Sequence, residues 1–222
     1  MVILQAQGLG YRYTSGMSFT FPDLVVNAGE KVLIMGPSGS GKSTFLNLVS
    51  GALRLQSGAL ELSGNHYKGL TSSALDRIRA DHLGVIFQTL NLIPYLSGYD
   101  NAALGVRFSN IRQSRVIDTR AEIHRLAASL GLTHAQLNAK ASQLSVGQQQ
   151  RIAVIRALLG HPELILADEP TSALDPVSTD QFMQELLSSF DPTTQAIVLV
   201  SHNPALTHFF DRVIAFEGLH HA

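Results

Sequence analysis

Cysteine is absent from this sequence of 222 residues, which excludes a disulfide, a thiolate metal site and a cysteine nucleophile. The sequence also lacks any run of about 18 or more uncharged apolar residues, so no segment is expected to span a membrane. The first residues, Met1 to Gln5, lack the basic and apolar regions of a signal peptide. These absences together lead us to expect a cytosolic protein.

An excess of positive charge is also missing. Sixteen Lys and Arg residues stand against seventeen Asp and Glu residues, for a formal net charge of −1, and there is no polybasic run. Nucleic acid and anionic lipid surfaces are therefore not expected as partners. The hydrophobic content of 45% and the charged content of 15% are typical of a globular protein, and the length suits one domain or a domain with a lobe.

A phosphate-binding motif is present in full. The stretch GPSGSGKST fits the pattern G-x-x-x-x-G-K-[ST] and lies between a buried strand, residues 31–35, and an amphipathic helix, residues 43–50. Its glycines let several backbone N–H groups point at one anion, and the helix adds its N-terminal dipole. Lys42 would reach the β- and γ-phosphates of a nucleotide, and the Ser43 hydroxyl would bind Mg²⁺. The residues expected to bind the phosphates are Gly36, Pro37, Ser38, Gly39, Ser40, Gly41, Lys42, Ser43 and Thr44.

Two carboxylates follow a second apolar run, Leu164 to Ala167. In a protein with a phosphate-binding loop, such a strand supplies the other half of the nucleotide site. The strand would carry Asp168 to the edge of the sheet, where it can hold Mg²⁺ through water. Glu169 would point at the water that attacks the γ-phosphate.

The segment from Leu144 to Arg151 reads LSVGQQQR. With this segment and the motifs above, the sequence resembles the ATP-binding subunits of ABC transporters, whose signature LSGGQ precedes a helix. Ser145 suits the N-cap of that helix, whose N-terminus can face an anion. The resemblance implies that Ser145, Gly147 and Gln148 close over ATP held by a second chain, so that two chains enclose two ATP molecules. Val146 stands where the family usually has glycine, and its β-branched side chain restricts the backbone.

Other positions match the family in order along nearly the whole chain. The resemblance implies that Gln88 contacts Mg²⁺ or water, that His202 senses the γ-phosphate, and that Ser172 to Asp175 couple the two sites of a dimer. It also places Tyr13 where an aromatic ring stacks on adenine, with Tyr11 as the alternative. From the residues alone, ordinary roles remain as alternatives: a strand-end polar residue for Gln88, a helix-start histidine for His202 and sheet packing for Tyr13.

Strands and helices alternate outside residues 90–144, which predicts an α/β fold with a mostly parallel sheet and right-handed crossovers. Alternating apolar residues in 2–13 and 17–26 predict antiparallel strands near a sheet edge. Residues 90–144 show only helical periodicity. We expect one ABC ATPase domain over residues 1–222: a P-loop NTPase core with an N-terminal antiparallel β subdomain, residues 1–89 and 145–222, and an inserted helical subdomain, residues 90–144. The expected helices are 72–81, 99–106, 118–130, 146–159 and 176–190, and the later strands are 59–62, 83–87, 163–167, 196–201 and 212–216, with 57–58 as a turn.

The reaction implied by the resemblance is hydrolysis of ATP to ADP and phosphate. Lys42, Mg²⁺ and the loop amides would neutralise the phosphate oxygens, and Glu169, helped by His202, would orient or deprotonate water. Ser145 and Gly147 of a second chain would complete the site, so that ATP binding closes a dimer.

The resemblance further implies a separate integral membrane permease, with this chain bound at the cytoplasmic face of the inner membrane. Phe87-Gln88 with Asn91 to Pro94, and Ala167 to Thr171, look most like the branch that includes lipoprotein-releasing and macrolide-efflux ATPases. An importer ATPase and an ABC ATPase that regulates a membrane complex remain alternatives. The groove for the coupling helix of the permease is expected near Leu92 to Tyr99.

Overall fold

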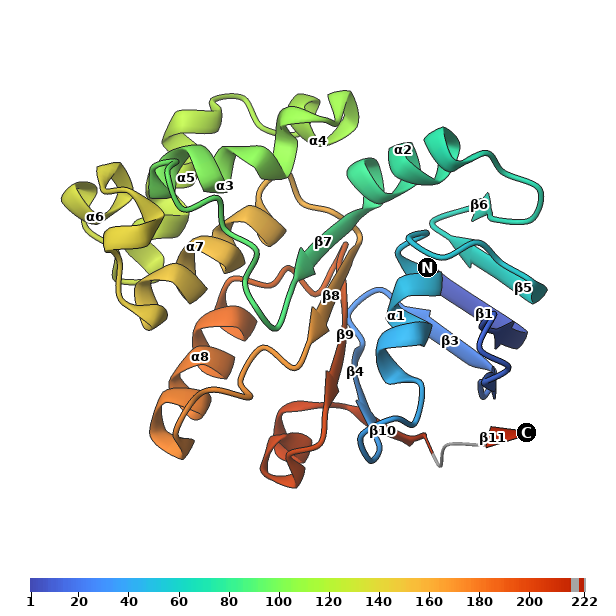
Figure 1. Ribbon diagram of the computed structural model, residues 1–222. Coiled ribbons are helices and arrows are strands. Elements are labelled where there is room, and N and C mark those ends of the chain that lie inside the picture. Colours follow the sequence, from blue (N-terminus) through green and yellow to red (C-terminus); the bar gives the residue numbers. More distant parts are fainter. Residues whose placement is uncertain (217–219, 222) are drawn as a thin grey trace.

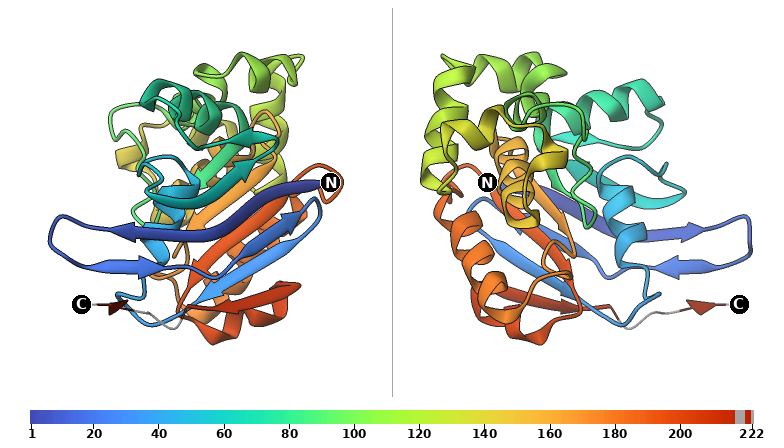
Figure 2. Two further views of the ribbon diagram at one scale, coloured as in Figure 1. Left: turned by 90° about the vertical axis from the view of Figure 1, so that its right-hand side faces the viewer. Right: turned by 60° about the vertical axis from the view of Figure 1, so that its left-hand side comes forward.

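Two sheets of different kinds form the frame of the molecule (Figures 1 and 2). The computed structural model describes residues 1–216 and 220–221. The strands of the antiparallel sheet lie in the order β11-β2-β1-β5-β6, with β3 paired to β1. The strands of the second sheet lie in the order β10-β4-β9-β8-β7, and every pairing in it is parallel. In the antiparallel sheet the bounds are β1 Val2–Arg12, β2 Ser18–Thr20, β3 Leu24–Asn27, β5 Ser57–Leu62, β6 Asn65–His66 and β11 His220–His221; in the parallel sheet they are β4 Lys31–Met35, β7 Leu83–Ile86, β8 Leu164–Asp168, β9 Ala196–Ser201 and β10 Arg212–Ala215.

Helices cover both faces of the parallel sheet. Figure 1 shows α1 and the antiparallel sheet on one side of it, and α3, α5, α7 and α8 on the other. The helices are α1 Lys42–Val49, α2 Ser72–His82, α3 Gly98–Arg107, α4 Asn110–Ser114, α5 Thr119–Ser129, α6 His134–Asn138, α7 Val146–Leu158 and α8 Pro176–Ser188, with 3₁₀ turns η1 Ala141–Gln143 and η2 Pro204–Phe209. Within the described residues, no helix has the length and apolar character needed to cross a membrane.

Alternate residues of the parallel strands enter two different hydrophobic cores. Val32 and Ile34 of β4 pack with Phe45 of α1 and with the antiparallel sheet. Leu33, between them, packs with the helices on the opposite face. Because side chains alternate across a strand, a strand that is covered on both faces reads as a continuous apolar run. This explains why β4, β8 and β9 lack the polar alternation of a half-exposed strand.

Helix α7 packs very tightly at its C-terminal end. A Cβ added at Gly84 of β7 would lie 2.1 Å from the Ala157 carbonyl oxygen, and one at Gly105 of α3 would lie 2.2 Å from that of Arg156. Glycine therefore allows β7 and α3 to approach the α7 backbone. The buried Arg112 guanidinium donates to the carbonyl oxygens of Leu159 (3.0 Å), Leu83 (2.8 Å) and Ala157 (3.0 Å).

Arg112 thus occupies the negative end of the α7 dipole as a cation, although burial lowers the pKa of its guanidinium to about 10. The side chain is only 3% exposed, so its donors are satisfied by backbone carbonyls in place of water. The C-terminal end of α7 is consequently joined to β7 as well as to the chain that follows it.

The expected α/β core, antiparallel β sheet and inserted helices are all present. The expected strands at 31–35 and 196–201 have the bounds of β4 and β9, and the expected helices at 72–81, 99–106 and 146–159 differ from α2, α3 and α7 by at most one residue at either end. The expected turn at 57–58 is wrong, because Ser57 and Gly58 already belong to β5 and Ser57 pairs with Gly10. Four further elements were not predicted from the sequence, each only two to five residues long: α4, α6, β6 and β11.

Candidate nucleotide-binding site

The phosphate loop, residues 36–44, joins the buried strand β4 to helix α1. Gly39 and Gly41 have φ angles of 82° and 90°, in the left-handed region that favours glycine. A Cβ at Gly36 would lie 2.7 Å from the Ser40 hydroxyl oxygen and 2.5 Å from the Phe216 carbonyl oxygen. The loop therefore needs glycine at the positions where the motif specifies it. Helix α1 begins immediately after Gly41 with no side-chain cap, so its first N–H groups stay available to an anion.

Lys42 is buried against this loop, with 6% of its side chain exposed. Its ammonium group donates to the carbonyl oxygens of Gly36, at 2.7 Å, and Pro37, at 2.9 Å. The same nitrogen lies 4.0 Å from Oε1 of Glu169. Two hydrogen bonds hold the ammonium beside the loop, where its charge faces the same space as the backbone amides.

Ser43 and Asp168 bring two oxygens together at the start of α1 and the end of β8. The Ser43 hydroxyl donates to Oδ1 of Asp168 at 3.4 Å. Burial raises the pKa of the Asp168 carboxyl and the nearby Glu169 carboxylate adds to this, whereas the Ser43 hydrogen bond and the charge of Lys42 act in the opposite direction. A desolvated carboxylate beside a hydroxyl suits a hard cation such as Mg²⁺, which prefers oxygen ligands. No cluster of three or more His, Cys, Asp or Glu side chains suited to a metal occurs in residues 1–216 and 220–221.

Glu169 has an unusual backbone. Its φ angle is 44°, which is uncommon for a residue with a side chain and costs about 1 to 3 kcal/mol where the surrounding structure imposes it. Its N–H donates to the Val200 carbonyl oxygen at 3.0 Å, so the β8–β9 pairing holds the residue in place. Its Oε2 lies 3.0 Å from Nδ1 of His202, which follows β9. The left-handed turn therefore aims the carboxylate at His202 and Lys42 together.

Gln88 lies just beyond the end of β7, the edge strand of the parallel sheet. Its Nε2 donates to the Ser172 hydroxyl oxygen at 3.4 Å. Ser172 lies in the segment 172–175, for which the family resemblance implies a role in coupling the two sites of a dimer. The contact joins two loops that lie 84 residues apart in the sequence.

Tyr13 contacts the phosphate loop through its hydroxyl group. That hydroxyl lies 3.0 Å from Oγ1 of Thr44, and the ring makes edge contacts with Tyr11 and Phe19. Tyr13 is not among the residues that line the adjoining cavity, whereas Phe19 and Met17 are. Met17 and Phe19 were not predicted as site residues, although both lie in the stretch 17–26, where alternating apolar residues predicted a strand.

These elements meet around one cavity of about 450 Å³. Its walls come from the phosphate loop, Gln88, Asp168 and Glu169, with Met17 and Phe19. The Ser40 hydroxyl is buried, without a hydrogen-bond partner in the part of the chain that the structure describes. Loop amides, a buried ammonium and a carboxylate–hydroxyl pair fit a nucleotide phosphate chain and its Mg²⁺ ion.

The signature segment, residues 144–151, lies elsewhere on the chain. None of its residues lines the cavity. Ser145 caps α7 by accepting a hydrogen bond from the Gln148 N–H at 3.3 Å, and Gln148 accepts one from the Ser145 N–H at 3.0 Å. This reciprocal pair is a capping box. Val146 is 57% exposed, so the start of α7 is a free surface of this chain.

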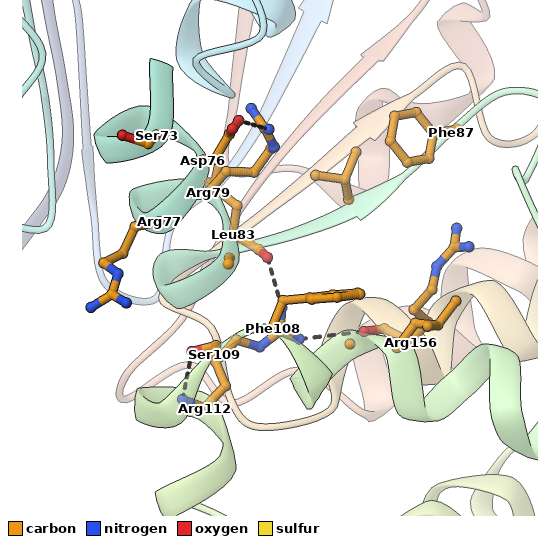
Figure 3. Close-up of a pocket in the computed structure, with 14 residues that line it drawn as sticks. Ser73, Asp76, Arg77, Arg79, Leu83, Phe87, Phe108, Ser109, Arg112 and Arg156 are labelled. Atoms are coloured by element: carbon orange, nitrogen blue, oxygen red, sulfur yellow. Dashed lines mark hydrogen bonds and ion pairs between the residues drawn. The ribbon is translucent and has the colours of Figure 1, made fainter. Parts of the chain in front are cut away.

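A second hollow, which we call the α2–α3 groove, has a volume of about 620 Å³ (Figure 3). Residues of α2, β7, α3, α4 and α7 line it, together with Phe87 and Phe108, whose exposed fractions are 40% and 76%. None of residues 92–99 lines this groove. One of its two aromatic residues, Phe87, directly precedes Gln88 in the sequence.

Comparison with known proteins matches residues 20–172 to a family model described as ABC transporter. A lipoprotein-releasing system ATP-binding protein, LolD 2 of Caulobacter vibrioides, is 38% identical over 198 residues, which are 89% of this chain and 85% of the relative. A macrolide export ATP-binding/permease protein, MacB of Hahella chejuensis, is 37% identical over 88% of this chain. The chain spans only 29% of that relative's length, and 32% of a probable export ATP-binding/permease protein of Pseudomonas fluorescens, with which it shares 36% identity over 96% of this chain.

Solved structures give a similar result. A dimeric ABC transporter cassette, MJ0796, matches with a TM-score of 0.80 and 32% identity over 97% of this chain and 95% of that chain. The same cassette in a post-hydrolysis state bound to ADP and Pi matches with a TM-score of 0.81 and 31% identity, over the same shares of the two chains. The fold expected from the sequence is confirmed by these matches.

Proposed function

Because this chain belongs to the ABC transporter family of ATP-binding proteins, we propose that it binds and hydrolyses ATP to drive a membrane permease of the lipoprotein-release or efflux type. The observation that carries this proposal is the cavity at the phosphate loop. Lys42, Gln88 and the adjacent pair Asp168 and Glu169 come from three separate parts of the sequence, and all of them line it. The resemblance to the ATP-binding proteins LolD 2 and MacB supports the choice of branch.

The phosphate loop is proposed to hold the phosphate chain of ATP. Backbone N–H groups of residues 36–44, with the positive end of α1, face the anion, and Lys42 adds a full charge. Tyr13, in contact with Thr44, is proposed to lie beside the adenine ring. Ser43 and Asp168 would hold Mg²⁺, with Gln88 as a further ligand directly or through water, and the ion would supply charge neutralisation at the phosphate oxygens.

Glu169 is proposed to orient the attacking water. Its Oε2 is engaged by His202, so Oε1 is the oxygen available to accept a hydrogen bond from water. In the reaction, the water oxygen forms a bond to the γ-phosphorus as the bond from that atom to the bridging oxygen of ADP breaks. The proton of the water passes to Glu169 or directly to phosphate, and His202 keeps the carboxylate in position.

A second copy of the chain is proposed to complete the site. The Ser145 cap and Gly147 do not line their own chain's cavity, so the Gly147 N–H and the proton of the Ser145 hydroxyl can face the γ-phosphate held by the other copy. In that arrangement ATP acts as a bridge between two chains, and hydrolysis removes the bridge.

The proposed site shared by two chains can be tested with substitutions of Ser145 that keep the N-cap of α7. Asp and Asn both cap helices well, so Ser145→Asp keeps the cap but places a negative charge opposite the phosphate, and Ser145→Asn keeps it without charge. We expect Ser145→Asp to lower phosphate release by about 100-fold, as loss of one transition-state donor does, and Ser145→Asn to lower it much less. Release per wild-type chain should rise with chain concentration. A Ser145→Asp chain with wild-type turnover, or with a weakened affinity of the single chain for ATP, would contradict the two-chain site.

The α2–α3 groove is the proposed docking site for the cytoplasmic segment of a membrane permease. It presents exposed Phe87 and Phe108 among several arginines, including the exposed Arg77, and Asp76 is the one carboxylate among its lining residues. Such a surface suits a short helix with apolar and acidic side chains. It differs from the docking site expected near residues 92–99, none of which lines this groove. It would place this chain at the cytoplasmic face of the membrane.

If a permease binds in the α2–α3 groove, a substitution of Phe108 should weaken the binding of that permease. The Phe108→Asp chain is expected to lose membrane partners when it is recovered from native membranes with ATP, because an exposed aromatic anchor becomes a charge that opposes an acidic helix. Ile111→Asp, an exposed control outside the groove, should retain them. A copurified protein with a large extracytoplasmic domain supports the lipoprotein-release or efflux branch, and a compact permease with a binding protein would point to import. Equal recovery of membrane partners by Phe108→Asp and wild type would exclude the groove as their site.

A further inference from the structure

The turn that follows β7 has a strained backbone. Leu90 and Asn91 have φ angles of 59° and 46°, so two consecutive residues with side chains occupy the left-handed region. The Leu90 N–H donates to the Phe87 carbonyl oxygen at 2.9 Å, and the Asn91 N–H to that of Thr89 at 2.7 Å. Such a pair persists only when the surroundings hold it. Gln88 lies within this turn, so the direction of its side chain depends on the turn's shape.

Arg156 of α7 holds the two left-handed residues in place. Its Nη1 donates to the Asn91 carbonyl oxygen at 2.8 Å, and its Nη2 to the Leu90 carbonyl oxygen at 2.6 Å. Both acceptors therefore belong to the two left-handed residues. The planar guanidinium offers two donors in a fixed geometry, which the single ammonium of lysine cannot reproduce.

The base of the Arg156 side chain is itself fixed. The Arg156 backbone lies against Gly105, where no Cβ is tolerated, and Arg112 holds the C-terminal end of α7 to β7. Arg112 already joins α7 to β7, so the two hydrogen bonds from the Arg156 guanidinium are not needed for that purpose. Figure 3 shows the Arg156 side chain extending toward the side of the α2–α3 groove that carries Phe87.

We propose that Arg156 is a positioning residue for Gln88: it holds the strained turn 87–91 in the one shape that directs Gln88 into the nucleotide cavity. The proposal rests on the proposed function. Arg156 touches neither the cavity nor the reacting atoms, and it acts only through the turn. Because Arg156 also lines the α2–α3 groove, a permease helix seated there contacts the residue that sets the direction of Gln88.

The test compares Arg156→Met, Arg156→Lys, Gln88→Ala and the double variant Arg156→Met/Gln88→Ala in the full chain. Methionine keeps the apolar stem without the fork, and the exposed Arg107→Met is the matched control. A group displaced by about 1 Å can cost about 100-fold in rate, so we expect Arg156→Met to lower phosphate release by about 10- to 100-fold and to raise the Mg²⁺ concentration for half-maximal release. Arg156→Lys should resemble Arg156→Met, and Arg107→Met the wild type.

Two readouts separate positioning from general support of the fold. If Arg156 acts through Gln88, the double variant is no slower than Gln88→Ala, within about twofold, because coupled residues are not additive. Without nucleotide, the amide protons of Leu90 and Asn91 should exchange at least about tenfold faster in Arg156→Met, whereas those of β8 and β9 keep their wild-type rates.

Fully additive effects, or unchanged exchange at Leu90 and Asn91, would overturn the proposal. If Arg156→Met does not fold, the same measurements are made on Arg156→Lys, which preserves the charge and most of the apolar stem. A wild-type chain that releases no phosphate would instead overturn the proposed function, and the exchange rates would still decide whether Arg156 holds the turn.

Discussion

Replacing Glu169 with glutamine is expected to abolish most ATP turnover while ATP remains bound. Glutamine keeps the size of the side chain and one oxygen, but it cannot accept a proton, and loss of a general base costs about 100- to 10,000-fold in rate. His202 contacts Oε2 of Glu169, so Oε1 is the oxygen proposed to accept the hydrogen bond from water. Phosphate release and the binding of labelled ATP, measured on the same preparation, separate the two effects.

The same variant should change the association of the chain. If ATP bridges two copies and hydrolysis separates them, the Glu169→Gln chain with Mg²⁺ and ATP accumulates as a dimer, and the wild type does not. Light scattering after gel filtration measures this directly. Glu61→Gln on β5, which lies outside the cavity, is the matched control and should behave as wild type. Turnover by Glu169→Gln within about threefold of wild type, far from the loss that a missing base causes, would remove Glu169 from the proposed role.

The Lys42→Ala variant is expected to lose affinity for ATP. The side chain is 6% exposed and carries the positive charge nearest to the phosphate loop amides, so its removal leaves the phosphates with neutral donors only. Two charge-assisted hydrogen bonds at about 1.5 to 3 kcal/mol each correspond to a loss of roughly 100-fold or more. Titration with a fluorescent ATP analogue measures the affinity.

The structure suggests the control for this experiment. Lys42 donates to the Gly36 and Pro37 carbonyl oxygens, so its removal also takes two partners from the loop itself. Thermal unfolding of Lys42→Ala therefore has to be compared with that of Lys31→Ala, which loses an exposed ion pair with Asp211. A Lys42→Ala chain that melts like wild type and binds ATP with unchanged affinity would refute the role of Lys42.

The parts of the nucleotide site that are contiguous in the sequence could be predicted from it. The phosphate loop is a contiguous motif whose residue types fix its backbone, and the carboxylates at 168 and 169 follow a strand that is buried on both faces. Their meeting with Gln88 and His202 follows from parallel strands, which bring their carboxyl ends to one edge of a sheet. The structure brings Glu169 and His202 into contact in this way, at 3.0 Å.

Contacts of single side chains with residues far away in the sequence could not be predicted. Arg156 reaches the Asn91 and Leu90 carbonyl oxygens across 65 and 66 residues, and in the sequence it is only one more arginine on a helix. The left-handed turn at Leu90 and Asn91 carries no glycine that would have signalled it. Helices α4 and α6 were missed because five residues are too few to show a period of 3.6.

The tight contact at the end of α7 has a mechanical consequence. With Gly84, Gly105 and Arg112 holding its C-terminal end, α7 has no room to slide along the sheet. Its 13 residues span about 20 Å at 1.5 Å per residue, with Ser145 at the far end. The helix can therefore move chiefly by tilting about its C-terminal end, which is packed against β7. On that length, a tilt of only about 10° displaces the Ser145 cap by about 3 Å, roughly the length of one hydrogen bond.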